Sequence, residues 1–441
     1  MHPIKLLLAL VVSCAAVGAA TTLLADGSQA AATNPPSAPA SARSATLPER
    51  MAQSLRTTLP LVVLDTDRAI LKTRKITGRM RLMNHATNRV GAPANGYDGF
   101  AGIEIRGHSS ARFAKKSYAV ELRDAAGENR NEKLLGMPSA NDWALYASHS
   151  DKSLMRNVLA YSTARRLGGW AARTRYVELV LNGRYQGVYV LMETVKLDRD
   201  RVAAAGSGIG GRYLAEMTLD KQVPSKGAYF RTPVKRQAVV YHDPERKELS
   251  QQEAAYLRRV VGGAERALYR RGAGSWRRQL HAPSAVDYVL LQELFKNADA
   301  FEASTFMFKG AGATLKLGPI WDLDIAMGNS RRGTAASTAG WITRNRVWGS
   351  RLLADPRFQR SLKLRWRKLR ATGLRASVLQ SASASVRELG PAANRNFRRW
   401  PVLSQRVWQE PMLRGSYSAE VRGLRAWLNR RVAWLDRQLG V

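Results

Sequence analysis

The first half of the chain is dominated by short apolar runs that favour β-strands. These runs lie at residues 59–65, 75–83, 102–106, 117–122, 176–181 and 187–193. The last two flank Asn182-Gly183, and an Asn-Gly pair between two β-rich runs is a strong signal for a hairpin. One helix is expected among them, from Lys152 to Leu167, because Gly168-Gly169 follows it as a stop signal.

The second half of the chain has the spacing of helices. Residues 251–271, residues 285–296 and most of the sequence from Pro356 onward follow this pattern. In the last segment, apolar residues recur at intervals of three and four, at Val421, Leu424, Leu428, Val432, Leu435 and Leu439. A β-rich part joined to a helical part predicts an α+β fold in two lobes. We place the β-rich lobe at about 59–205 and the helical lobe at about 206–441.

The N-terminus has the pattern of a secretory signal peptide. Met1–Lys5 carries a positive charge, Leu6–Ala20 is apolar, and small residues precede the expected cleavage point at residue 20. This run is too short to cross a bilayer comfortably, which takes about 20 residues, and no later stretch is long and uncharged enough. Residues 21–47 are rich in Ala, Ser and Pro and are expected to form a linker before a domain at 48–441.

The only cysteine, Cys14, lies inside this apolar run. A disulfide framework is therefore excluded. A second interpretation is that Val11-Val12-Ser13-Cys14 resembles a bacterial lipobox, whose cysteine would carry a lipid anchor. Both interpretations predict an exported protein in the periplasm, outside the cell or on its surface, with no transmembrane span in the mature chain.

The composition adds a strong positive charge. The 441 residues are 45% hydrophobic, which excludes disorder of the bulk, and 70 Lys+Arg against 34 Asp+Glu give a net charge of +36. Residues 331–441 carry about half of this excess, with 24 Lys+Arg and 5 Asp+Glu. Such a balance favours an anionic partner. An acidic envelope polymer fits better than nucleic acid, because the chain is predicted to be exported and has no recognition motif.

The first candidate for chemistry is Trp321-Asp322-Leu323-Asp324, which follows a strand-like run at residues 314–320. Buried carboxylates cost several kcal/mol unless they are paired or bound to a cation. Oxygen ligands at the end of a strand suit Mg²⁺ or Mn²⁺. The alternative is that one aspartate caps a helix and the other pairs with an arginine.

A second acidic position, Asp299, lies 23 residues before Asp322 and is followed five positions later by Ser304 and then by a strand-like run at residues 305–309. A kinase catalytic loop has this order: a carboxylate that receives the substrate hydroxyl proton, a small polar ligand, and then a metal-binding aspartate. The departures are clear. His-Arg does not precede Asp299, Ser304 replaces asparagine, and Asp-Leu-Asp replaces Asp-Phe-Gly.

The third candidate is a Gly/Ser-containing loop at residues 106–118, which ends in two lysines that enter a strand. Such a loop can place backbone N–H groups and an ammonium near a polyphosphate. Its candidate phosphate contacts are Arg106, Ser109, Ser110, Lys115 and Lys116. Since the segment has neither GxGxxG nor a Walker lysine, a surface hairpin turn with solvated lysines is the alternative.

Taken in order, several motifs resemble the spore-coat CotH kinase family. They are Arg106-Gly107-His108-Ser109-Ser110, Lys115-Lys116-Ser117-Tyr118, Leu134-Leu135-Gly136-Met137-Pro138, Asp142-Trp143, residues 151–157, residues 181–189, Met192-Glu193 and residues 318–324 with Gly328-Asn329. The resemblance extends over about residues 59–370. It implies an atypical protein-kinase-like fold that transfers phosphate from ATP to serine with Mg²⁺ or Mn²⁺.

The resemblance also implies roles for individual residues. Asp299 corresponds to the catalytic-loop carboxylate, Asp322 to the metal-binding aspartate and Asp324 to a second acidic contact, while Lys116 or Lys115 would contact phosphate. Ser304 would complete the metal ligands. Further nucleotide contacts are expected from Arg106, Ser109, Ser110, Arg156, Met192 and Glu193, with Met192-Glu193 at the position of a hinge that meets adenine.

The sequence thus predicts an exported kinase that phosphorylates serine residues of an envelope or secreted protein, and the basic surface would suit an acidic acceptor. Two alternatives stay open. One is a non-catalytic CotH-like surface binding protein, and the other is a binder of an anionic envelope polymer through the Arg-rich C-terminal region. The sequence does not distinguish phosphoryl transfer from nucleotidyl transfer.

Overall fold

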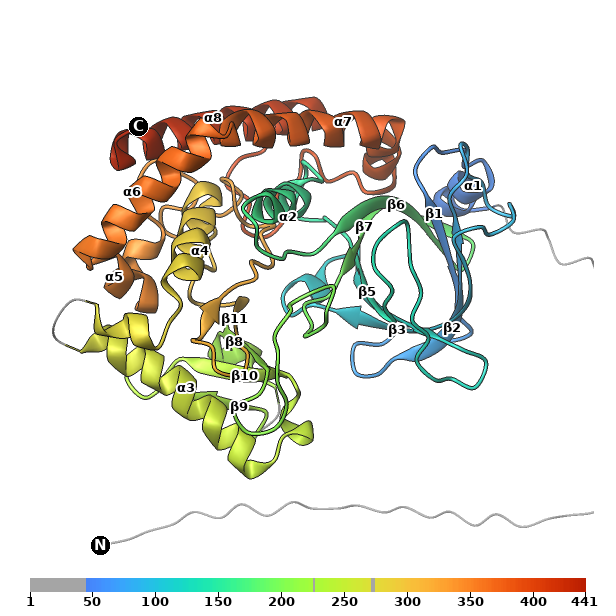
Figure 1. Cartoon of the computed structure of the whole chain (residues 1–441). Helices are drawn as coiled ribbons and strands as arrows, with labels where there is room; N and C mark the ends of the chain where they lie inside the picture. Colours follow the sequence, from blue (N-terminus) through green and yellow to red (C-terminus); the bar gives the residue numbers. More distant parts are fainter. Residues whose placement is uncertain (1–44, 225–226, 271–273) are drawn as a thin grey trace, which may run out of the picture. The chain divides into compact units, whose positions relative to one another are not determined.

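The computed structural model describes residues 45–224, 227–270 and 274–441 (Figure 1). The predicted signal peptide, Cys14 and nearly all of the predicted linker lie outside these residues. The described part is a mixture of helices and sheets, which confirms the predicted α+β class. None of its helices is both long enough and apolar enough to cross a membrane.

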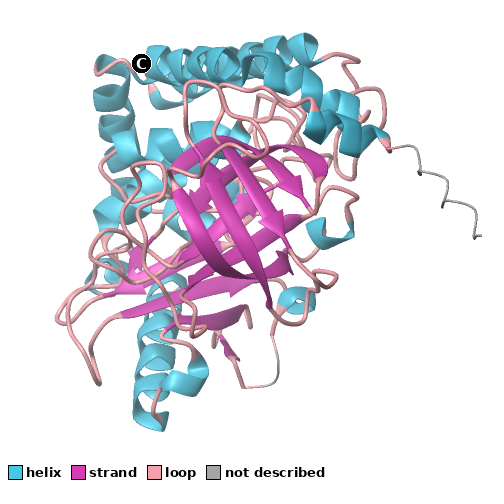
Figure 2. Ribbon diagram, turned by 90° about the vertical axis from the view of Figure 1, so that its right-hand side faces the viewer, coloured by secondary structure: helices cyan, strands magenta, loops and turns pink. Residues whose placement is uncertain are grey.

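Seven strands close into a barrel in the first half of the chain (Figure 2). They are β1 (Leu61–Asp65), β2 (Ile76–Met83), β3 (Tyr97–Arg106), β4 (Ser117–Arg123), β5 (Asp142–Tyr146), β6 (Thr174–Leu181) and β7 (Arg184–Glu193). Their order is β1-β2-β3-β4-β5-β7-β6, and a parallel pairing of β1 with β6 closes the barrel. The predicted hairpin is confirmed: Asn182 and Gly183 join β6 to β7 with φ of 49° and 70°, the positive values that a two-residue turn requires.

A second sheet lies in the part of the chain that the sequence predicts to be mainly helical. Its strands are β8 (Tyr213–Thr218), β9 (Tyr229–Arg231), β10 (Ala238–Asp243), β11 (Thr305–Lys309) and β12 (Lys316–Leu317), in the order β12-β11-β8-β10-β9. Only the last two coincide with strand-like runs in the sequence. The central strand β8 is buried along nearly all its length, so it lacks the polar and apolar alternation that identifies a half-buried strand.

The helices are α1 (Leu47–Gln53), α2 (Arg156–Arg166), α3 (Gln251–Tyr269), α4 (Ala282–Phe295), α5 (Val347–Leu353), α6 (Pro356–Ala371), α7 (Leu374–Arg399) and α8 (Tyr417–Leu439). Short 3₁₀ turns lie at Ser110–Arg112, Asp220–Gln222, Arg246–Glu248, Ser275–Arg278 and Thr343–Asn345. Every apolar position predicted along α8 is buried. Helix α2 begins four residues later than predicted, because the Asp151 carboxylate accepts from the backbone N–H groups of Ser153 and Arg156 and holds the preceding residues in a turn.

Helix α7 joins the helical part to the barrel (Figure 1). Glu178 on β6 is fully buried, and Arg395 of α7 reaches it with Nε at 2.9 Å from Oε1 and Nη2 at 2.6 Å from Oε2. The Tyr185 hydroxyl donates to the same carboxylate. One residue further, Asn396 Oδ1 accepts from the backbone N–H of Val188 at 3.1 Å. The bidentate ion pair therefore satisfies a charge that would otherwise stand unpaired inside the barrel wall.

This pair predicts a large effect of Arg395→Ala. The substitution leaves the buried Glu178 carboxylate without its cation, so we expect the free energy of unfolding to fall by about 3–5 kcal/mol. Urea unfolding followed by circular dichroism measures the loss. Arg398→Ala removes an exposed cation from the same helix and should change stability by no more than about 0.5 kcal/mol. Equal losses in the two variants would show that the ion pair does not fix α7 to the barrel.

Candidate active site

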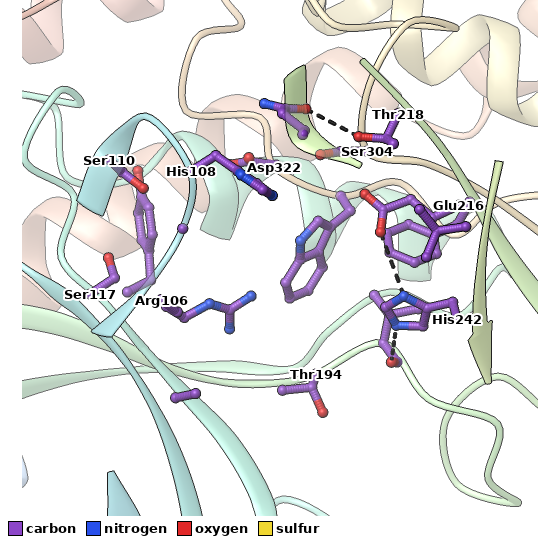
Figure 3. Close-up of a pocket in the computed structure, with 18 of the residues that line it drawn as sticks. Arg106, His108, Ser110, Ser117, Thr194, Glu216, Thr218, His242, Ser304 and Asp322 are labelled. Atoms are coloured by element: carbon purple, nitrogen blue, oxygen red, sulfur yellow. Dashed lines mark hydrogen bonds and ion pairs between the residues drawn. The ribbon is translucent and has the colours of Figure 1, made fainter. Parts of the chain in front are cut away.

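A cleft of about 810 Å³ lies between the barrel, α2 and the second sheet (Figure 3). Strands β3, β4, β5 and β7 contribute to its wall from the barrel, and β8, β10 and β11 contribute from the second sheet. Eight of the predicted site residues line it: Arg106, Ser109, Ser110, Met192, Asp299, Ser304, Asp322 and Asp324. The fold thus brings together side chains that are up to 218 positions apart in the chain.

The turn that carries Asp322 is held by two side chains one helical turn apart on α2. The backbone N–H of Asp322 donates to the Tyr161 hydroxyl at 3.1 Å, and the N–H of Leu323 donates to Asn157 Oδ1 at 2.7 Å. Asp322 has a φ of 56°, a left-handed conformation that is costly for a residue other than glycine. The surrounding hydrogen bonds therefore stabilise a strained turn that directs Asp322 to the cleft.

Asp324 is fixed from the other side. Its Oδ2 accepts from Ser150 Oγ at 3.1 Å, and its backbone oxygen accepts from Asn329 Nδ2 at 2.8 Å. Asn329 Nδ2 also donates to the Ser150 carbonyl oxygen at 2.9 Å. These bonds lock the loop that contains both aspartates.

The two carboxylates are held where ionisation is unfavourable. Burial raises the pKa of Asp322 well above its usual range, and the charges of Asp324 and Asp299 raise it further, while Arg106 opposes the shift. Burial raises the pKa of Asp324 to about 6, although the hydrogen bond from Ser150 lowers it. A bound cation would relieve both the burial cost and the mutual repulsion.

These oxygen donors fit a divalent metal whose remaining ligands come from the substrate. Among the residues that the structure describes, no group of three or more His, Cys, Asp or Glu side chains is arranged as a metal site. Mg²⁺, however, is commonly held by one or two carboxylates and by oxygens of the substrate phosphates. Asp322 and Asp324 could supply such carboxylates, and the Ser304 hydroxyl lines the same cleft.

Asp299 lies just after α4 and belongs to a network of charges. Arg332 Nη1 forms an ion pair with Asp299 Oδ1, and Arg332 Nη2 lies 2.7 Å from Glu302 Oε2. Arg346 pairs with the other oxygen of Glu302. The sequence did not indicate these arginines as site residues, because they lie 33 or more positions from Asp299. The network fixes one oxygen of the Asp299 carboxylate.

Arg106 is the cation whose charge opposes the raised pKa of Asp322. It ends β3 and extends into the cavity (Figure 3). Its guanidinium lies 5.6 Å from the ring centroid of Trp321, which in turn stacks on Tyr161 at 5.7 Å. Burial lowers the pKa of Arg106, whereas the Asp322 charge raises it. Asp322 and Arg106 therefore interact inside the cleft.

Tyr146 was not singled out from the sequence. It ends β5 and lines the cleft, and its buried hydroxyl has no hydrogen-bond partner among the described residues. Burial raises the pKa of Tyr146 well above its usual value, and the charges of Asp324, Asp151 and Asp322 add to the shift. The hydroxyl is thus a neutral donor. An unsatisfied buried polar group costs about 1–3 kcal/mol, which a ligand oxygen would offset.

The two lysines expected to contact phosphate are not on the cleft, and this corrects their assignment. Lys115 is buried, and its Nζ donates to the Val188 carbonyl and to Asn396 Oδ1, the latter at 2.9 Å. Burial lowers the pKa of Lys115 well below its usual value. Lys116 Nζ donates to the Ala111 carbonyl at 2.8 Å. Both side chains join parts of the fold.

Arg156 and Glu193 are also outside the lining, which corrects their assignment as nucleotide contacts. Arg156 pairs with the buried Asp151, and its Nε donates to the Ala326 carbonyl at 3.1 Å. Glu193 is fully buried on β7 and pairs with Arg173 at 2.8 Å. Adjacent residues on a strand point to opposite faces, so Met192 reaches the cleft and Glu193 does not.

The far wall of the cleft contains a second polar pair that the sequence did not indicate. His242 Nδ1 on β10 lies 3.5 Å from Glu216 Oε2 on β8, and its Nε2 lies 3.1 Å from the Val195 carbonyl oxygen (Figure 3). Burial lowers the pKa of His242, but the hydrogen bond and charge of Glu216 outweigh it and the net shift is upward. Neither strand had been predicted, so no signal located this pair.

Three comparisons relate the chain to known proteins. A family model described as CotH kinase protein matches residues 103–435. A comparison with curated proteins gave no match. Among solved structures, the chain is similar to one from Shewanella oneidensis MR-1 described as the toxin–antitoxin system HipA, HipB and its operator DNA complex. The identity is 14%, the TM-score is 0.34, and the match covers 80% of this chain and 68% of that chain.

The raised carboxylate pKa predicts that Asp324→Asn stabilises the metal-free protein at neutral pH. The folded state keeps the proton of Asp324 to about pH 6, whereas the usual pKa is 3.8, so ionisation costs wild-type stability progressively as pH rises through this window. We expect the variant to be more stable by about 1–3 kcal/mol at pH 7.5 and no more stable near pH 4. Urea unfolding in EDTA at the two pH values measures this. An advantage independent of pH would contradict it.

Proposed function

The chain belongs to the CotH kinase family, and we propose that it is an exported kinase that transfers phosphate from ATP to serine residues of an acceptor protein. The observation that carries this proposal is the convergence of Asp299, Asp322 and Asp324 on one cleft. In this proposal the barrel serves as one lobe of a kinase-like fold. The helices and the second sheet form the other lobe, and the nucleotide binds between them.

Each group on the cleft then has a role in phosphoryl transfer, which depends mainly on positioning and charge neutralisation. Asp322 and Asp324 would hold Mg²⁺ or Mn²⁺, and Ser304 would add a hydroxyl ligand. The bound metal supplies neutralisation of the phosphate charge. In this proposal Arg106, in place of Lys115 or Lys116, contacts the phosphates of ATP. Its planar fork suits two phosphate oxygens.

Asp299 would receive the proton of the acceptor serine. Its ion pair with Arg332 holds the carboxylate in position. Met192 at the end of β7, and the loop residues Ser109 and Ser110, line the same cleft and would contact the nucleotide. Nucleotidyl transfer would use the same metal and phosphate contacts. The two reactions are distinguished by the group that reaches the acceptor: the γ-phosphoryl group in one, and the nucleotide with its α-phosphate in the other.

The first test is labelling with ATP that carries the label on the γ-phosphate, in Mg²⁺ or Mn²⁺. We expect wild type to label itself or a serine-rich protein. Asp299→Ala should lose about 100-fold or more because it removes the base, and Asp322→Ala should lose at least as much because it removes a metal ligand. Lys116→Met is the matched control that should keep most activity.

Three results would contradict the proposal. Equal labelling by Asp322→Ala would exclude the metal assignment. Labelling with ATP that carries the label on the α-phosphate, but not with ATP labelled on the γ-phosphate, would indicate nucleotidyl transfer. Absence of nucleotide-dependent thermal stabilisation in wild type would favour the non-catalytic surface protein that the sequence left open.

The unpartnered hydroxyl of Tyr146 gives a second test, with opposite signs for stability and binding. Tyr146→Phe removes a buried group that has no partner in the described chain. The free energy of unfolding without ligand should therefore stay unchanged or rise by about 1 kcal/mol. The thermal shift induced by Mg²⁺ and a non-hydrolysable ATP analogue should fall, because a donor to a phosphate oxygen is lost. A full shift in the variant would show that the hydroxyl does not contact the ligand.

A further inference from the structure

Helix α6 has an outer face that is basic along its whole length. Residues 356–371 contain seven cations and no Asp or Glu. The inward side of the helix buries Phe358, Leu362, Trp366 and Leu369. Helical spacing places the opposite side in solvent, and it carries Arg357, Arg360, Lys363, Leu364, Arg367 and Lys368, all exposed. Figure 1 shows α6 at the edge of the molecule, away from the barrel.

Most of this charge is not neutralised within the described chain. Arg365 and Arg370, on the flanks of the helix, pair with Asp287 and Asp436. Ion pairs to the cations of the outer face are absent from the part of the chain that the structure describes. Arg367 instead donates to the Gly440 carbonyl oxygen at 3.2 and 3.0 Å. The outer face is therefore a site of concentrated positive charge.

An apolar side chain lies at the centre of these cations. Leu364 is 65% exposed, more than any other large hydrophobic residue of the described chain. On the helix it is flanked by Arg360 and Lys368, one turn before and one turn after. Val441, 53% exposed, directly follows the Gly440 carbonyl that Arg367 contacts. Leu364 thus places an exposed apolar side chain among the cations of the outer face, where contact with an apolar phase would remove it from water.

We propose that the outer face of α6 docks on the surface of an anionic phospholipid bilayer. The cations would contact the headgroup phosphates, whose attraction adds up over successive Lys and Arg side chains. Leu364 would enter the boundary between headgroups and acyl chains, as apolar residues of interfacial helices do. A soluble acidic polymer would also use the cations but would gain little from the leucine, so the leucine favours a bilayer. Helix α6 lines no part of the cleft, so the inference is independent of the proposed kinase activity.

The experiment is co-sedimentation of the protein, residues 45–441 or the full chain, with vesicles of phosphatidylglycerol or of phosphatidylcholine. We expect binding to the anionic vesicles alone, weakened by salt. The triple variant Arg357→Gln, Arg360→Gln and Lys368→Gln should bind at least about tenfold less tightly. The control variant Arg89→Gln, Lys133→Gln and Arg184→Gln removes the same charge from exposed positions of the barrel region and should bind like wild type. Leu364→Gln should reduce binding several-fold with no change in net charge.

Three results would overturn the proposal. Failure of wild type to sediment with phosphatidylglycerol excludes a bilayer as the partner. Equal losses in the triple and control variants would mean that binding follows net charge and does not involve α6. Full binding by Leu364→Gln would indicate purely electrostatic adsorption, as expected for a soluble anionic polymer. Circular dichroism of each variant confirms that the loss does not come from unfolding.

Discussion

The burial of Asp322 and Asp324 in one loop is the constraint on which the rest of the cleft depends. Two carboxylates held together away from water repel each other, and burial opposes the ionisation of both. The loop is kept in place by hydrogen bonds from α2 and from Ser150 and Asn329, although Asp322 adopts a left-handed conformation. The loop is thus less stable than an unstrained, uncharged loop would be, but it holds the two carboxylates in fixed positions. Such strain is common at functional sites.

The cleft differs in charge from the rest of the molecule, and this bears on the metal ion of the proposed reaction. The chain as a whole is strongly basic, yet its cleft is lined by nine carboxylates and only two side chains that are always cationic, Arg106 and Lys196. The acidic set is Glu104, Asp142, Glu216, Asp243, Glu245, Glu248, Asp299, Asp322 and Asp324. Cations that accompany a polyphosphate would favour its binding to such an acidic lining. The acidic lining therefore supports a role for a divalent metal in the proposed reaction.

The sequence predicted the parts of this arrangement that depend on order along the chain. Asp299, Ser304 and Asp322 follow one another at kinase-like offsets, and the structure brings them to one cleft. The sequence could not predict the direction of side chains in an irregular loop. Lys115, for example, follows a Gly/Ser loop but points inward and donates to Val188 and Asn396. Partners distant in sequence were equally hidden, as Arg332 is for Asp299. The second sheet was missed because β8, buried on both sides, lacks alternation.

The acidic cleft and the basic outer face of α6 are two distinct charged surfaces. Interactions between exposed charges are screened beyond about 8 Å at physiological ionic strength, and α6 contributes no side chain to the cleft. The outer cations of α6 and the carboxylates of the cleft therefore belong to two different surfaces of the protein. Net charge alone describes neither surface. In the proposed docking, the basic excess of α6 serves binding to an anionic surface, whereas the proposed chemistry of the cleft depends on a few acidic residues that are not evident from the overall composition.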